Sequence, residues 1–101
     1  MKRANDIVQW GVARNLVGPT GEATKLSQFR KTQEEVLELL EAIDLDSPEL
    51  AMDAIGDIYV TLVLQAEMWG FYMGDCVEAA WTEIKDRKGR MENGVFVKEV
   101  V

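Results

Sequence analysis

The sequence Glu34-Glu35-Val36-Leu37-Glu38, followed by Glu41 one turn later, decides how the rest of the chain is interpreted. On a helix, Glu34, Glu38 and Glu41 fall on nearly one line, because each residue advances about 100° around the axis. Like charges spaced four residues apart destabilise an isolated helix, and no lysine interrupts this strip before Asp46. The strip is therefore either a well-hydrated acidic face or a binding site for a cation.

The flanking residues predict that the strip lies on the second of several helices. A first helix is expected to begin at Asn5 or Asp6, whose side chains can cap it, and the segment 17–21, with one proline and two glycines, ends it. The second helix is expected to start within residues 20–27 and to end near Asp44 or Leu45. It carries a row of apolar residues along one side: Leu26, Phe29, Val36, Leu40 and Ile43.

A third, mostly apolar helix is predicted next. Ser47-Pro48 is typical of a helix start, because a capping side chain and a proline favour the first turn. Gly70 is expected to end the helix just after Trp69. The segment 58–64 is rich in β-forming residues. We nevertheless interpret it as helix, since the apolar pattern continues beyond the usual length of a strand.

The C-terminal residues predict a fourth helix and a short hairpin. The helix is expected to begin at an Asp75 cap, to run to about Lys88 and to end at Gly89, with four side chains pointing inward: Val77, Ala80, Trp81 and Ile84. Asn93-Gly94 between apolar residues is typical of a tight hairpin turn. These elements predict an all-α fold, roughly a four-helix bundle with a short C-terminal hairpin or an extended tail, in a single domain spanning residues 1–101.

Composition excludes several classes of function. The chain of 101 residues has a net charge of −7, which argues against nucleic acid or anionic membranes as partners, and its longest apolar run is too short to span a bilayer. It contains no histidine, which removes imidazole ligands and Ser-His triads. The single cysteine, Cys76, cannot form an internal disulfide, as expected in a reducing cytoplasm.

A second acidic pair lies on the predicted third helix. Asp53 and Asp57 are four residues apart and share one face of a helix that is otherwise mostly apolar. One interpretation is that Asp53 complements the helix dipole and Asp57 faces water. The other is a cation site between the two acidic helices, because an ionised carboxylate in apolar surroundings is costly unless it is paired or bound to metal. Without histidine or a thiolate, such a site selects Mg²⁺, with Mn²⁺ as the alternative.

Basic residues gather after the fourth helix. Lys85, Arg87, Lys88 and Arg90 form either a solvated helix end that matches the dipole or a phosphate-binding patch. Lys31, just before the glutamate strip, is a weaker candidate for the same role. Trp10 could stack on a nucleobase, although a tryptophan in a small helical domain more often belongs to the core.

Four segments resemble one known family. Glu34-Glu35-Val36-Leu37-Glu38 is similar to the EExxE segment of the MazG-like, all-α nucleoside triphosphate pyrophosphohydrolases, and segment 53–60 is similar to their second acidic segment, ExxD. Segments 9–16 and 83–91 also resemble small stand-alone members, phage-encoded ones included. The resemblance implies Mg²⁺-dependent hydrolysis of nucleoside triphosphates to monophosphate and pyrophosphate, in nucleotide-pool housecleaning, by a homodimer or homotetramer.

The resemblance and the chemistry of the site together give expected roles for individual residues. The expected metal ligands are Glu35, Glu38 and Asp57, with Asp53 as a substitute ligand, and Glu34 or Glu38 would orient or deprotonate the attacking water. The expected substrate-binding residues are Lys85, Arg87, Lys88, Arg90, Lys31 and Trp10. Two positions depart from the family pattern: Ala54 stands where ExxD has its first acid, and Leu37 stands where many relatives have glycine.

Two alternatives follow from these departures and from the breadth of the family. Ala54 favours a helical interaction or regulatory protein that kept the fold and lost catalysis. A narrower enzyme, specific for the pyrimidine nucleotides dUTP or dCTP, is the other alternative.

Overall fold

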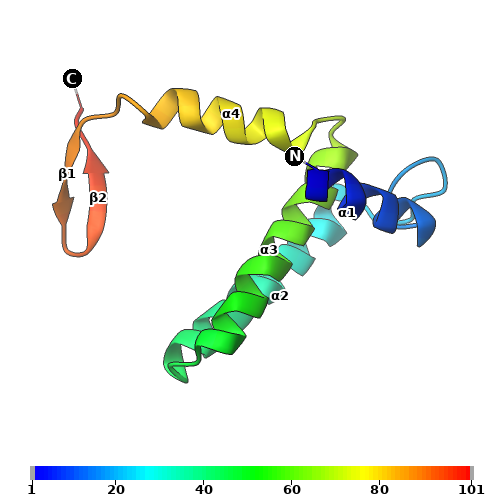
Figure 1. Ribbon diagram of the computed structural model, residues 1–101, viewed down its shortest axis with the longest axis horizontal. Helices are drawn as coiled ribbons and strands as arrows, with labels where there is room; N and C mark the ends of the chain where they lie inside the picture. The colour runs from blue at the N-terminus through cyan, green and yellow to red at the C-terminus, as the bar shows by residue number, and fades with distance from the viewer. Residues whose placement is uncertain (1, 101) are drawn as a thin grey trace.

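The computed structural model describes residues 2–100, with the backbone alone at residue 2, and these residues form helices followed by a small β-hairpin (Figure 1). The elements are α1 (Lys2–Ala13), α2 (Lys25–Asp44), α3 (Pro48–Met68), α4 (Met73–Ile84), β1 (Gly89–Glu92) and β2 (Val95–Lys98). Helices α2 and α3 pack side by side in opposite directions, and α1 and α4 meet the same end of this α2–α3 pair. The chain is therefore mostly helical, as predicted.

Local capping fixes the ends of the two long helices. Thr24 and Ser27 form a capping box, in which each side chain accepts a hydrogen bond from the other's backbone N–H at 2.9 Å. The Ser47 hydroxyl accepts a hydrogen bond from the Leu50 N–H at 3.3 Å, ahead of a proline in the first turn. Gly70, with φ of 78°, follows the end of α3. The predicted bounds of both helices, and helix rather than strand over 58–64, are confirmed.

Helix α1 starts earlier than predicted. It begins at Lys2, so Asp6 lies inside the helix and pairs with Arg3 at 2.7 Å instead of capping. Gly11 faces α3, where a β-carbon would lie 2.6 Å from Cδ2 of Leu64. A glycine at this position therefore lets the two helices approach closely. Within residues 2–100, no helix combines the length and the apolar character needed to cross a membrane.

Helix α4 differs more strongly from the prediction. It begins after Tyr72, which makes no side-chain capping bond, and Asp75 lies in its first turn instead of at the cap. An acid there still complements the helix dipole, and the predicted cap at Asp75 lies three residues after the cap in the structure, Tyr72. The helix ends at Ile84, and Gly89 opens β1 instead of ending the helix. The hairpin turn at Asn93-Gly94 is confirmed, with φ of 51° and 80° as a type I′ turn requires.

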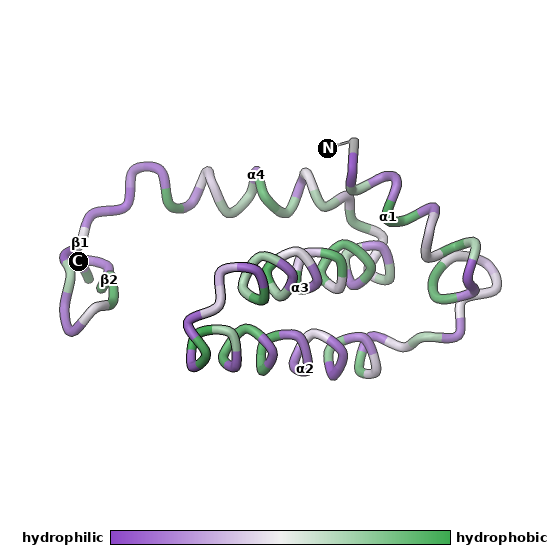
Figure 2. Tube along the Cα trace, turned by 60° about the horizontal axis from the view of Figure 1, so that its bottom comes forward, coloured by the Kyte–Doolittle hydropathy of each residue, from purple (hydrophilic) through white to green (hydrophobic). Residues whose placement is uncertain are grey.

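The helices do not close into a four-helix bundle within one chain. Figure 2 shows α2 and α3 side by side, with α4 running apart from α2 and the β-hairpin beyond it. None of the four side chains predicted to point inward from α4 is buried, although α4 contacts α3. The radius of gyration is 16.1 Å, whereas a compact domain of this length has about 13 Å. The predicted bundle is therefore wrong for the single chain.

Candidate metal centre

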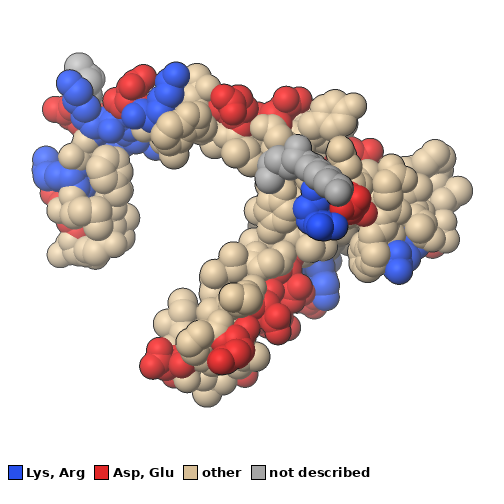
Figure 3. Space-filling model, in the orientation of Figure 1, with Lys and Arg blue, Asp and Glu red and all other residues tan. Residues whose placement is uncertain are grey.

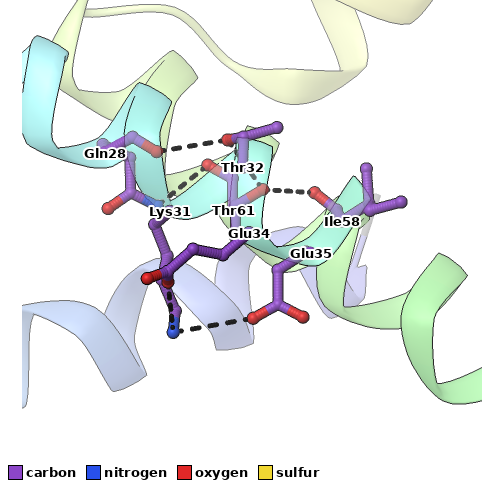
Figure 4. Close-up of polar contacts among 7 residues, drawn as sticks. All are labelled: Gln28, Lys31, Thr32, Glu34, Glu35, Ile58 and Thr61. Atoms are coloured by element: carbon purple, nitrogen blue, oxygen red, sulfur yellow. Dashed lines mark hydrogen bonds and ion pairs between the residues drawn. The ribbon is translucent and has the colours of Figure 1, made fainter. Parts of the chain in front are cut away.

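A line of polar side chains fixes how α2 lies on α3. The Gln28 amide, which is buried, donates a hydrogen bond to the Thr61 carbonyl at 3.1 Å, and the Thr32 hydroxyl donates to the Thr61 hydroxyl at 3.0 Å (Figure 4). Glu35 lies seven residues after Gln28, on the same face of α2. The hydrogen bonds of Gln28 and Thr32 to Thr61 therefore fix the side of α2 that faces α3, and Glu35 lies on that side.

Glu35 forms a group of three carboxylates with Glu38 of α2 and Asp57 of α3. One carboxylate oxygen from each lies within 4.8 Å of the others. Glu35 is buried, at 7% exposed, while Glu38 and Asp57 are exposed. The Oε2 atom of Glu35 is buried and has no hydrogen-bond partner within the described residues. A buried carboxylate oxygen without a partner is costly, so this group, here called the acidic group, favours a proton or a cation.

The surroundings of Glu35 raise the pKa of its carboxyl group. A hydrogen bond that Glu35 can share with the Glu38 carboxyl only when it is protonated raises the pKa of Glu35, and burial and the negative charge of Glu38 raise it further. Lys31 opposes this rise in the pKa of Glu35, with its Nζ 3.6 Å from Oε1. The same Nζ lies 3.2 Å from Oε2 of Glu34, and this contact raises the pKa of Lys31. Lys31 thus bridges two glutamates and supplies part of the positive charge that Glu35 needs (Figure 4).

The other predicted acids lie outside this group. Glu34 is exposed and pairs with Lys31. Asp53 is exposed and lines an adjoining groove of about 270 Å³ together with Glu38 and Asp57. Ala54, at 2% exposed, is buried and also lines this groove. The structure therefore brings three of the predicted acids together and places Asp53 beside them.

The acidic group fits a hard divalent cation. Its donors are all carboxylate oxygens, which Mg²⁺ and Mn²⁺ prefer. Magnesium usually takes one or two carboxylates and keeps water or phosphate oxygens in its other positions. The exposure of Glu38 and Asp57 leaves the solvent side of the group open for such ligands.

A groove of about 450 Å³ runs beside the acidic group. Its lining includes Trp10, Lys31, Glu35 and Asp57, so two predicted substrate-binding residues meet the acids here. Trp10 is half-exposed, and the Arg14 guanidinium lies over its ring at 4.5 Å from the ring centroid. Arg14 was not predicted as a site residue. The signal was its position four residues after Trp10, which places the two side chains on one face of a helix.

The predicted basic patch lies elsewhere in the chain. Lys85, Arg87, Lys88 and Arg90, here called the basic end, follow the last turn of α4 and lead into β1, away from the acidic group of the same chain (Figures 1 and 3). Arg87 pairs with Glu83 at 3.1 Å, and Arg90 pairs with Glu92 at 2.8 Å. One chain alone therefore does not bring these residues to the acids.

Comparison with known proteins finds similarity over part of the chain only. No family model matches the chain, and no solved structure matches it. The chain is 37% identical over 62 residues to a protein of Haemophilus phage HP1, described as an uncharacterized 18.2 kDa protein in the rep-hol intergenic region. The matched stretch is 61% of this chain and 36% of the phage protein, so the chain spans about a third of that relative's length. The relative's description names no activity.

Proposed function

We propose that the protein is a Mg²⁺- or Mn²⁺-dependent nucleoside triphosphate pyrophosphohydrolase of the cytoplasm. The observation that carries the proposal is the buried Oε2 of Glu35, which has no hydrogen-bond partner among the described residues and belongs to a group with Glu38 and Asp57. A cation bound there would compensate the charge that burial makes costly. The similarity of the two acidic segments to MazG-like enzymes supplies the substrate class.

Each residue of the site has a chemical task in this proposal. A bound Mg²⁺ would neutralise phosphate charge and activate water. Glu35, Glu38 and Asp57 would supply ligands from two different helices, and Glu38, which is exposed, would also take the proton of the attacking water. Water adds to a phosphorus of the α–β linkage, the bridging P–O bond breaks, and monophosphate and pyrophosphate leave. Glu34 is held by Lys31, which makes it the weaker candidate for this role.

The groove beside the acidic group suits the rest of a nucleotide. The half-exposed ring of Trp10 offers a surface on which a base can stack. Lys31 keeps its positive charge, and a triphosphate could replace its carboxylate partners. Sanitation of the nucleotide pool is the biological role that this chemistry fits.

The test is pyrophosphate release from a panel of canonical and modified nucleoside triphosphates, including dUTP and dCTP, with Mg²⁺. We expect cleavage by the wild type and a loss of about 100-fold or more in Glu38→Gln, because removal of a general base usually costs this much. Asp44→Asn removes one charge from the same helix outside the acidic group and serves as the matched control. Cleavage of no nucleotide, or equal rates in Glu38→Gln and wild type, would contradict the proposal. Activity confined to dUTP or dCTP would select the pyrimidine-specific alternative.

A second candidate is an interaction or regulatory protein without catalysis. It is favoured by Ala54, a buried residue where the ExxD segment has an acid. This candidate predicts that neither Mg²⁺ nor nucleotide raises the melting temperature, whereas the enzyme is stabilised by both.

A further inference from the structure

The α2–α3 pair has two chemically different sides. Residues 34–57 carry nine acidic residues and no basic one, and Trp10 of α1 lies on the acidic side, next to Asp57. Helical spacing places a set of apolar residues on the opposite side of the pair. All of them are exposed in the single chain, and they are Phe29, Val36, Leu40, Ile43, Met52, Ile55 and Leu62.

The C-terminal elements α4, β1 and β2, here called the arm, lack a core of their own. A free helix of about 12 residues is marginal in water, and so is an isolated two-stranded hairpin. No residue of the arm is buried. Its apolar side chains are instead exposed on both elements: Val77, Trp81 and Ile84 on α4, and Met91, Val95, Phe96 and Val97 on the hairpin. The arm therefore needs a surface to pack against.

The solvent-accessible area of the chain indicates how much surface a partner would have to cover. The chain exposes 7903 Å², whereas a compact monomer of 11.4 kDa exposes about 5,800 Å². An excess of about 2,000 Å² on each of two chains falls within the range buried by obligate homodimers. A second copy of the chain is thus an occupant of the right size.

The arrangement of the elements indicates how the second copy lies. Helix α1 and the arm project on opposite sides of the α2–α3 pair (Figures 1 and 2), and Figure 3 shows a wide hollow between the arm and the pair. If two pairs meet through their apolar sides in this hollow, the acidic side of each faces the far end of the other's arm. Helix α4 has 12 residues and is about 18 Å long, and the four-residue strands of the hairpin add about 13 Å. The arm is therefore long enough to cross the partner's α2–α3 pair, which is about 20 Å wide.

The charge of the far end of the arm is complementary to that of the acidic side of the α2–α3 pair. Residues 85–98 carry five basic and two acidic residues, in a chain whose net charge is −7. Within the described part of the chain, Lys85 and Lys88 pair with no carboxylate. A basic segment opposite a strip of acids is the complementary arrangement expected at a specific interface.

We propose that two copies form an arm-exchanged dimer, in which the basic end of each copy covers the acidic group of the other. The dimer itself does not depend on the proposed function. The assignment of the partner's cations to substrate phosphates does rest on it. In that arrangement each active site is completed by the second subunit, which explains why the predicted acidic and basic residues lie apart in one chain.

The oligomeric state is the first test. Light scattering after size exclusion should give about twice the chain mass of 11.4 kDa for the wild type and one chain mass for Trp81→Glu. Thr82→Glu adds the same charge on the polar side of α4 and should remain a dimer. A monomeric wild type, or a dimeric Trp81→Glu, would overturn the proposal.

Mixed-label cross-linking tests the arm exchange without any enzyme activity. Unlabelled and ¹⁵N-labelled wild-type protein are mixed in denaturant, refolded together and treated with a zero-length carbodiimide. We expect peptides that join Lys85 or Lys88 to a glutamate of α2, with one labelled and one unlabelled partner. If these peptides occur only with both partners from the same label, the arm folds onto its own chain and the exchange is wrong.

Complementation tests the shared active site. Glu38→Gln lacks one carboxylate of the acidic group but has a normal basic end, whereas the double variant Lys85→Ala/Lys88→Ala has an intact acidic group and a weakened basic end. Mixed dimers regain one intact site, so an equal mixture should recover about a quarter of wild-type activity in a two-fold dimer. No recovery, with an active wild type, would contradict the shared site. If the wild type itself is inactive, the proposed function fails, and the cross-links alone decide the arm exchange.

Discussion

At the scale of single residues, Glu35 is where folding and function meet. Packing of α2 on α3 buries its carboxylate beside Glu38 and leaves Oε2 without a partner among the described residues. Lys31 offsets part of this cost from one side. The ionised Glu35 carboxylate is therefore expected to lower the free energy of unfolding of the cation-free protein. It is expected to raise that free energy once a cation is bound.

The raised pKa of Glu35 predicts a specific pH dependence. Without divalent cations, the carboxyl stabilises the fold when it is protonated, below its ordinary pKa of about 4.3, and this contribution is lost as the pH rises through the raised pKa in the folded state. The free energy of unfolding, measured with urea between about pH 4 and about pH 8, should therefore fall more steeply in the wild type than in Glu35→Gln. The slope should remain in Asp44→Asn. Equal slopes in wild type and Glu35→Gln would show that Glu35 is not perturbed.

Ala54 gives a second prediction at this scale. The residue is buried and lines a groove with Glu38, so Ala54→Glu would place another carboxylate among the existing ones. We expect the free energy of unfolding in EDTA to fall by about 2 kcal/mol or more. Asp53→Glu, on the exposed neighbouring residue, should change it by less than about 0.5 kcal/mol. A fully stable Ala54→Glu would mean that this position is open to solvent.

At the scale of elements, the polar contact between α2 and α3 sets the register on which the site depends. Gln28 donates to the Thr61 carbonyl in a buried environment, so Gln28→Ala leaves that carbonyl with fewer partners. The free energy of unfolding should fall by about 1–3 kcal/mol, as measured by urea denaturation. Gln33→Ala, on the exposed side of α2, is the control and should have little effect. If Gln28→Ala and Gln33→Ala changed the free energy of unfolding equally, the hydrogen bond of Gln28 would not stabilise the contact between α2 and α3.

The sequence predicts features that depend on residues close together in the chain, such as helix ends. It does not predict which side chains become buried when two helices pack, or which remain exposed in the single chain. Thr24, Ser47 and Gly70 mark helix ends through local hydrogen bonds and backbone conformation, and these ends were predicted correctly. The resemblance of the two acidic segments predicts the three acids of the acidic group as metal ligands. The burial of Glu35, however, follows from the contact of two helices, which no spacing within α2 reveals. The apolar pattern around Trp81 predicts that it points inward, but the described part of the chain leaves it exposed.

At the scale of the whole molecule, the exposed apolar surface predicts a stability that depends on concentration. Association couples to folding by mass action, so the melting temperature of the wild type should rise as protein concentration increases. Trp81→Glu, which lacks the arm contact, should melt at a temperature that does not change with concentration. Calorimetry over a 100-fold range of concentration gives both results, and a constant wild-type melting temperature would indicate a monomer.

Isothermal titration with Mn²⁺ tests the proposal that Glu35, Glu38 and Asp57 together hold a divalent cation. We predict saturable binding to the wild type that tightens as the pH rises, because protons compete for the same carboxylates. Affinity should fall by about 10-fold or more in Asp57→Asn, whereas Asp53→Asn, outside the acidic group, should lose much less. Absence of binding to the wild type, or equal affinities of Asp57→Asn and wild type, would contradict the claim.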